Sequence, residues 1–136
     1  MTFVLEHPCG LRIERNLHES EVQQVDGVSA REMGTGYVWY RLPKAEIAGR
    51  SIAMSLCFFE QRLDTLSLAD ADPEFGASWD DWSEAKESAR AEATKRWLEA
   101  VGYPVGDYDW GVVWAGTDPK TGDGGGGVRF ERSRAA

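Results

Sequence analysis

Hydrophobic residues at the start of the chain alternate with polar ones, which is the spacing of a half-buried β-strand. Two such runs flank the segment 7–10, in which a proline presets the backbone and a glycine can take a positive φ. The pattern predicts an N-terminal hairpin whose inward side chains are Phe3, Leu5, Leu11 and Ile13. A short helix is expected next over Glu19–Val25, capped by Asn16 or His18 and followed by Gly27.

The middle of the chain carries the clearest strand pattern. Residues 36–42 are rich in aromatic and β-branched side chains and end at Pro43, which predicts a strand with apolar groups on both faces. Alternation over 51–60, a short polar break and an apolar run over 63–68 predict an antiparallel hairpin. The remaining segments lack a period and are predicted to be loops or connections: 28–35, 44–50 and 69–77.

An amphipathic helix from Ser78 to Gly102 is the prediction with the most complete signals. Ser78 is the expected N-cap, and Gly102 followed by Pro104 is the expected stop. The charges suit the helix dipole, with acids in the early turns and bases in the late ones: Asp80, Asp81, Glu84, Glu87, Lys95 and Arg96. Arg96 also follows Glu92 at the spacing of a supportive pair. The predicted apolar stripe is Trp82, Ala85, Ala89, Ala93, Trp97, Leu98 and Val101.

Two strands are predicted after the helix. Residues 108–115 form the first, in which Gly111 indicates a bulge or a close backbone approach. The segment 118–122 has proline and glycine at positions typical of a hairpin turn. The glycine run 124–127 is interpreted as a flexible hairpin tip that weakens the start of the last strand. Residues 133–136 are expected to fray.

These elements predict a single α+β domain over residues 1–136. Its core would be a mostly antiparallel sheet of about five to seven strands, with one long helix packed on one face. The length of 136 residues and the hydrophobic content of 42% are typical of one globular domain.

The formal net charge of −8 weighs against nucleic-acid binding, because phosphate recognition requires clustered lysine and arginine. An acidic chain can instead steer basic proteins towards its surface. The N-terminus lacks the pattern of a signal peptide and no run of about 18 apolar residues occurs, so a cytoplasmic protein without a membrane partner is expected. Cys9 and Cys57 are too far apart to indicate a disulfide framework, and Cys57 reads as a small core residue.

No motif typical of catalysis or of metal binding stands out. His7, Cys9 and His18 lack the spacing of a zinc site, and nothing places a third catalytic group beside them. The acids of segment 70–74 alternate, but the segment lacks the glycine and the final glutamate of an EF-hand loop. The glycine run lacks the GK[ST] ending of a phosphate loop. We therefore predict no catalytic residue, no metal site and no cofactor.

Five of the six tryptophans lie between positions 79 and 114. Trp82 and Trp97 are interpreted as core residues because they share the helical stripe. Trp79 beside Asp80, and Trp114 near a hairpin end, fit interface anchors rimmed by acids. The predicted partner-binding residues are Asp70, Asp72, Glu74, Trp79, Asp80, Asp81 and Glu84.

The C-terminal half also resembles a group of small, largely uncharacterised bacterial proteins, some of which are similar to immunity proteins encoded beside secreted toxins. The shared pattern is WxxWSExxE, then WL, YxWG and DxKxG. Its positions in this chain are Trp79, Trp82, Ser83, Glu84, Glu87, Trp97, Leu98, Tyr108, Trp110, Gly111, Asp118, Lys120 and Gly122. The pattern leads us to expect alternating β-branched residues after the turn, where this chain has four glycines. The resemblance implies an immunity-type function.

Three functions follow as hypotheses. The leading one is a non-catalytic binding protein, most specifically an immunity-type inhibitor that covers a basic toxin with an acidic, tryptophan-containing surface. The second is a structural or self-associating domain, in which the edge of the terminal hairpin pairs with a second copy to form a homodimer. The third is a small enzyme that uses Cys9 or the carboxylates of the long helix.

Overall fold

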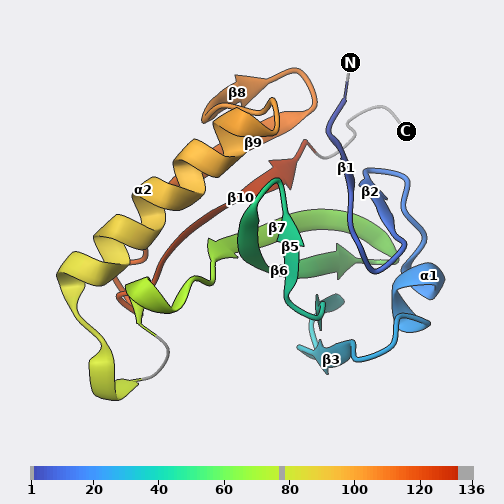
Figure 1. Ribbon diagram of the computed structural model, residues 1–136. Helices are drawn as coiled ribbons and strands as arrows, with labels where there is room; N and C mark the ends of the chain where they lie inside the picture. Colours follow the sequence, from blue (N-terminus) through green and yellow to red (C-terminus); the bar gives the residue numbers. More distant parts are fainter. Residues whose placement is uncertain (1, 77–78, 132–136) are drawn as a thin grey trace.

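An antiparallel sheet of eight strands runs through the described residues, 2–76 and 79–131, of this computed structural model (Figure 1). The strand order is β3-β4-β6-β7-β10-β9-β8, and β5 pairs with the first part of β6. The strands are β3 Ser29–Glu32, β4 Tyr37–Arg41, β5 Ala45–Ile47, β6 Arg50–Phe59, β7 Arg62–Asp70, β8 Gly106–Tyr108, β9 Gly111–Thr117 and β10 Gly124–Phe130. A separate hairpin consists of β1 Val4–Glu6 and β2 Arg12–Glu14.

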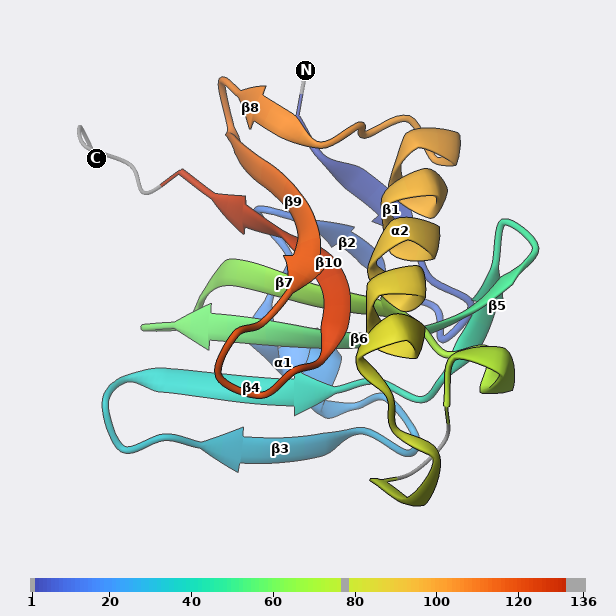
Figure 2. The ribbon, with the colours of Figure 1, turned by 90° about the vertical axis from the view of Figure 1, so that its left-hand side faces the viewer.

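The long helix α2, Glu84–Ala100, packs on one face of this sheet against β7, β9 and β10 (Figure 2). The predicted α+β class, with one long helix on a mostly antiparallel sheet, is therefore confirmed, although the sheet has more strands than expected. No helix of the described residues is long and apolar enough to cross a membrane.

The N-terminal hairpin and short helix form as predicted. The four alternating apolar side chains of the hairpin are all buried: Phe3, Leu5, Leu11 and Ile13. Helix α1 covers Glu19–Gln23, with His18 as its N-cap, and the Glu21 carboxylate accepts a hydrogen bond from the His18 N–H at 3.3 Å. Gln23 donates to the Tyr40 hydroxyl at 3.0 Å, and that hydroxyl donates to Glu19, so polar contacts attach α1 to β4.

Two segments predicted to be irregular are strands. β3 lies at the edge of the sheet with all four side chains exposed, so it has no buried face to produce an apolar pattern. β5 is joined to β6 by Ala48 and Gly49, both at positive φ (51° and 82°). Glu60 and Gln61 make the same kind of tight turn between β6 and β7, at φ 50° and 70°. The β6–β7 hairpin itself was predicted correctly.

The helix α2 starts later than the sequence indicates. Its N-cap is Ser83, whose hydroxyl accepts a hydrogen bond from the Lys86 N–H at 3.1 Å. Ser78 lies outside the described residues, and a short 3₁₀ helix, η2 (Trp79–Asp81), precedes the cap. The predicted end is correct, because the helix stops at Ala100 and Gly102 takes φ 100°. The pair Glu92–Arg96 is present at 3.7 Å.

The predicted apolar stripe of α2 is wrong for three of its seven residues. The buried residues are Glu87, Ala91, Thr94, Trp97 and Leu98, whereas Trp82, Ala85 and Ala89 are exposed. Two of the inward positions are polar and satisfied: the Thr94 hydroxyl accepts from the Asp70 N–H at 3.1 Å, and Glu87 is ion-paired. Hydrophobic periodicity cannot detect a buried face that depends on such polar contacts.

The glycine run 124–127 is not a flexible tip but the start of β10, an interior strand between β7 and β9. A Cβ at Gly124 would overlap the Glu87 carbonyl of α2, and a Cβ at Gly125 would lie 2.7 Å from the Leu68 carbonyl oxygen. The missing side chains therefore allow the helix and neighbouring strands to approach β10 closely.

The segment 108–115, predicted as one strand, turns at Asp109-Trp110 and contributes to two, β8 and β9. The close approach expected at Gly111 is confirmed, because a Cβ there would lie 3.0 Å from the Phe130 Cα. Trp110 turns into the core, where its ring centroid lies 5.8 Å from that of Phe3. The N-terminal hairpin is thus packed against the C-terminal strands.

Candidate functional site

The outer face of the sheet, on the side away from α2, carries a row of small side chains between two large ones. The strand pairing places Arg41, Ser55, Ser67, Gly127 and Trp114 next to one another across five strands. The neighbouring row pairs Ala53 with Ala69 and Gly125 with Gly116. The side chains of both rows point to the face of the sheet away from α2, because alternate residues of a strand share a face. Between Arg41 and Trp114, neither row has a side chain larger than serine.

The indole of Trp114 lies against the glycine run of β10. A Cβ at Gly127 would be 2.7 Å from Cζ2 of the Trp114 indole, so only glycine leaves room for this arrangement. The indole buries Gly127, yet 39% of Trp114 stays exposed. An aromatic ring that covers a paired glycine stabilises the strand and here also forms one wall of a depression.

The depression is a groove of about 1330 Å³ that continues past the end of the strands towards α2. Small residues form its floor, among them Ala53, Ser55, Ser67, Ala69 and Gly125. Arg41 and Lys44 line one end, and Trp82, Asp118 and Asp123 line the other. The two ends therefore differ in charge.

The acidic end joins two segments that are distant in the sequence. Trp82, from the segment before α2, packs against Gly122 of the β9–β10 turn, where a Cβ would lie 3.0 Å from the indole Cζ2. Exposed acids lie on both segments, with Asp80, Asp81 and Glu84 on one and Asp118 and Asp123 on the other. Trp82 is 41% exposed, so the predicted core role is wrong for this residue, whereas Trp97 is buried as expected.

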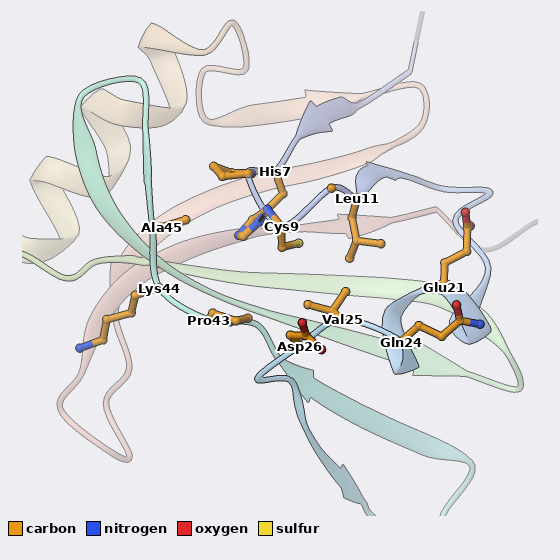
Figure 3. Close-up of a pocket in the computed structure, with 12 residues that line it drawn as sticks. His7, Cys9, Leu11, Glu21, Gln24, Val25, Asp26, Pro43, Lys44 and Ala45 are labelled. Carbon is orange, nitrogen blue, oxygen red and sulfur yellow. Dashed lines mark hydrogen bonds between the residues drawn. The ribbon is translucent and has the colours of Figure 1, made fainter.

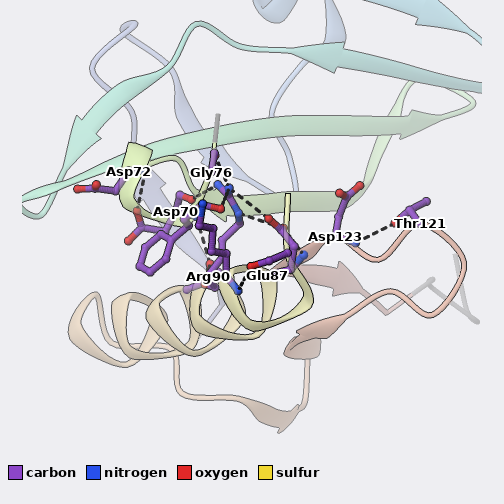
Figure 4. A network of polar contacts seen from close by, with 12 residues as sticks. Asp70, Asp72, Gly76, Glu87, Arg90, Thr121 and Asp123 are labelled. Atoms are coloured by element: carbon purple, nitrogen blue, oxygen red, sulfur yellow. Dashed lines mark hydrogen bonds and ion pairs between the residues drawn. The ribbon is translucent and has the colours of Figure 1, made fainter. Parts of the chain in front are cut away.

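A buried ion pair holds this end together (Figure 4). Arg90 Nε donates to Glu87 Oε1 at 3.1 Å, and the Gly124 N–H donates to the same carboxylate oxygen at 2.9 Å. The other guanidinium nitrogens donate to the carbonyl oxygens of Asp70, Phe75 and Gly76 at 2.6–2.7 Å. Arg90 thus ties α2 to the 70–76 loop, and Glu87 ties it to β10. Glu87 was predicted only as an acid that suits the helix dipole and as a position of the shared pattern, and no role was predicted for Arg90.

The three loop acids proposed as partner contacts share one arginine. Asp70 is fully buried and bonded to Arg50 at 2.7 Å, while Asp72 and Glu74 lie 3.9 and 3.4 Å from the same guanidinium. Asp72 also caps the 3₁₀ helix η1 (Pro73–Phe75) through the Glu74 N–H. In this conformation Asp70 supports the loop and does not reach the surface. Asp80, Asp81 and Glu84 are exposed, and the side chain of Trp79 lies outside the described part.

A second pocket, of about 630 Å³, lies between the β1–β2 turn, α1 and β5 (Figure 3). His7, Cys9, Glu21, Asp26 and Lys44 contribute the polar groups to its lining. The Cys9 N–H donates to His7 Nδ1 at 3.0 Å, which leaves the proton of the neutral imidazole on Nε2. His7 is 4% exposed, and its Nε2 has no hydrogen-bond partner among the described residues.

Burial lowers the pKa of His7 below its ordinary value, because desolvation disfavours the imidazolium. The unfolded chain then binds a proton at a higher pH than the native protein does. The stabilising contribution of a neutral His7 is present above about pH 6.5 and is lost as the pH falls from there towards the native pKa. We expect His7→Asn, whose amide oxygen can accept from Cys9, to lose less stability than the wild type between pH 7 and pH 5. Urea unfolding at several pH values across this range measures how the free energy of unfolding depends on pH. The same pH dependence in the wild type and in His7→Asn would contradict the lowered pKa of His7.

The second thiol, that of Cys57, lies in the core. Burial, followed by the charge of Asp64, raises the pKa of the Cys57 thiol to about 11, so it stays protonated in the core. Within the described ranges, no three His, Cys, Asp or Glu side chains are grouped so that they could hold a metal ion. Comparisons with protein-family models, curated proteins and solved structures gave no match to this chain.

Proposed function

We propose that this chain is a non-catalytic binding protein whose acidic end and adjoining groove engage a basic protein partner. The observation that carries the proposal is the meeting of Trp82 and the acids of two separate segments at the mouth of the groove. Most specifically, we propose an immunity-type inhibitor that acts in the cytoplasm and covers a basic bacterial toxin.

The physical properties of this end suit such a partner. The exposed carboxylates of Asp80, Asp81, Glu84, Asp118 and Asp123 outnumber the two nearby lysines, Lys86 and Lys120, so the local field attracts a cationic surface. Tryptophan is enriched among the residues that contribute most of the binding energy at protein interfaces. The Glu87 contact holds the start of β10 next to the acidic β9–β10 turn, which reduces the entropy lost on binding.

Co-expression with any secreted toxin that is encoded beside the gene tests the proposal. We expect the wild type to protect the cells and to form a stable complex with one toxin, with an association rate that falls as the salt concentration rises. A triple variant, Asp80→Lys, Asp81→Lys and Glu84→Lys, should lose protection. The control is a triple variant with the same change in charge, Glu99→Lys, Asp107→Lys and Asp109→Lys, in the segment that runs from the end of α2 to the β8–β9 turn. This control should keep protection. Absence of protection by the wild type against every such toxin would end the proposal.

The alternatives have weaker support. The terminal hairpin does not offer its last strand for self-association, because β10 is paired on both sides, with β7 and β9. For an enzyme that uses Cys9, the candidate site is the pocket that His7 and Cys9 share. His7 Nδ1 is occupied by a backbone N–H and its Nε2 is buried, so the imidazole has no exposed nitrogen with which to accept the Cys9 proton.

A further inference from the structure

The groove on the outer face of the sheet gives a more specific inference, which rests on the proposed function. We infer that the groove holds an extended segment of the basic partner, with a cationic side chain at the Trp82 end and a carboxylate at the Arg41 end. Shape, length, charge and anchoring residues each support this occupant.

The shape of the groove suits an extended chain. Its floor consists of serine, alanine and glycine positions on four adjacent strands, β6, β7, β10 and β9, so a main chain can lie close to the sheet. The Ser55 and Ser67 hydroxyls lie side by side in the central row and can exchange hydrogen bonds with peptide groups.

The length of the groove sets the length of the segment. The row from Arg41 to Trp114 crosses five strands, and adjacent strands lie about 4.8 Å apart. Four such spacings give roughly 19 Å. An extended chain rises about 3.3 Å per residue, so about six residues fill the row.

The charges at the two ends determine which segment fits. Asp118 and Asp123 line the groove beside Trp82, and the exposed Asp80 and Asp81 lie on the segment that carries this tryptophan. A lysine or arginine placed there gains both the carboxylates and the face of an indole. Arg41 and Lys44 lie at the opposite end, where they favour a carboxylate. A uniformly basic segment would meet repulsion at that end.

Trp114, at the β9 end of the row, provides an apolar contact. Its indole lies against Gly127 and the residue is 39% exposed, so a partner side chain can cover it. Ser67, which is exposed in the middle of the floor, has no such structural role, and it is the natural position at which to obstruct the groove.

The inference can be tested directly with two synthetic peptides of about six residues and equal composition. One carries arginine and aspartate at opposite ends of a threonine–alanine chain, and the other carries both charges in the centre. We expect the first to shift the NMR signals of the Trp82 and Trp114 indoles and of Gly125, with a Kd at least about tenfold lower than that of the second. Equal affinity for the two peptides, or shifts confined to other residues, would overturn the inference.

Ser67→Tyr is the decisive variant, because it fills the floor without removing any buried group. It should abolish binding of the first peptide, whereas Ser29→Tyr, the same change on the exposed edge strand β3, should leave binding unchanged. Retention of binding by Ser67→Tyr would exclude the groove.

The same two variants separate this inference from the proposed function. Full protection against a toxin by Ser67→Tyr would overturn the groove as the docking site and leave the proposed function standing. Failure of the wild type to protect against any toxin, together with peptide binding that Ser67→Tyr removes, would overturn the proposed function and keep the groove as a peptide site.

Discussion

Arg90→Met should lower the free energy of unfolding by about 3–5 kcal/mol, the typical cost of removing one partner from a buried ion pair. Glu87 would remain in the interior with its charge unpaired, and the carbonyl oxygens of Asp70, Phe75 and Gly76 would lose their shared donor. Methionine retains most of the volume of the arginine stem, so the loss reports on polar contacts and not on a cavity. Urea unfolding followed by circular dichroism measures the change.

Arg96→Met on the same helix is the matched control. Its ion pair with Glu92 is exposed, with 76% of the Arg96 side chain accessible, so the expected change is below about 0.5 kcal/mol. Arg90→Lys should fall between the two, because lysine keeps the charge but cannot reach several carbonyls at once. Similar effects of Arg90→Met and Arg96→Met would show that the contacts of Arg90 do not hold α2 to the 70–76 loop.

Gly124→Ala should cost about 3 kcal/mol, near the upper end of the range for overpacked positions. The added methyl would overlap the Glu87 carbonyl and lie 3.1 Å from the Ala91 nitrogen, so α2 would have to move away from β10. That movement would also weaken the hydrogen bond from the Gly124 N–H to the Glu87 carboxylate. The loss should appear as a lower midpoint of urea unfolding, with an unchanged m-value.

Gly116→Ala is the matched control for Gly124→Ala. It lies on the neighbouring strand β9, where a Cβ would meet no heavy atom within 4 Å. We expect stability to stay the same or rise by up to about 1 kcal/mol, because alanine reduces the entropy of the unfolded chain. An equally small change in stability for Gly124→Ala would contradict the close packing of α2 on β10.

The sequence predicts those parts of the fold in which local pattern and tertiary environment agree. The alternation of Ile52, Met54, Leu56 and Phe58 identifies β6 correctly because one face of this strand is buried. The end of α2 at Gly102 follows from the need for a positive φ. The sequence does not indicate strand β3, because every side chain of this strand is exposed and no apolar pattern results. Its stability comes from main-chain pairing with β4.

The groove could not be predicted, for a related reason. Its floor is defined by side chains that are small or missing, and glycine in a sequence indicates flexibility unless its neighbours are known. Gly127 pairs with Trp114 across two strands, and Ser67 lies beside Ser55, but these contacts depend on the register of the sheet. The acids at positions 80, 81 and 84 were identified as surface groups, whereas the turn carboxylates of Asp118 and Asp123 were not associated with them.

The position of β10 has a consequence for synthesis of the protein. Ribosomes make this strand after every other element of the fold, yet it lies between β7 and β9 in the middle of the sheet. Until it emerges, the nascent chain presents two unpaired strand edges and a helix without the glycine surface on which it rests. A chain interrupted before residue 124 therefore lacks the strand that joins its two halves, and such a fragment exposes the edges that favour aggregation.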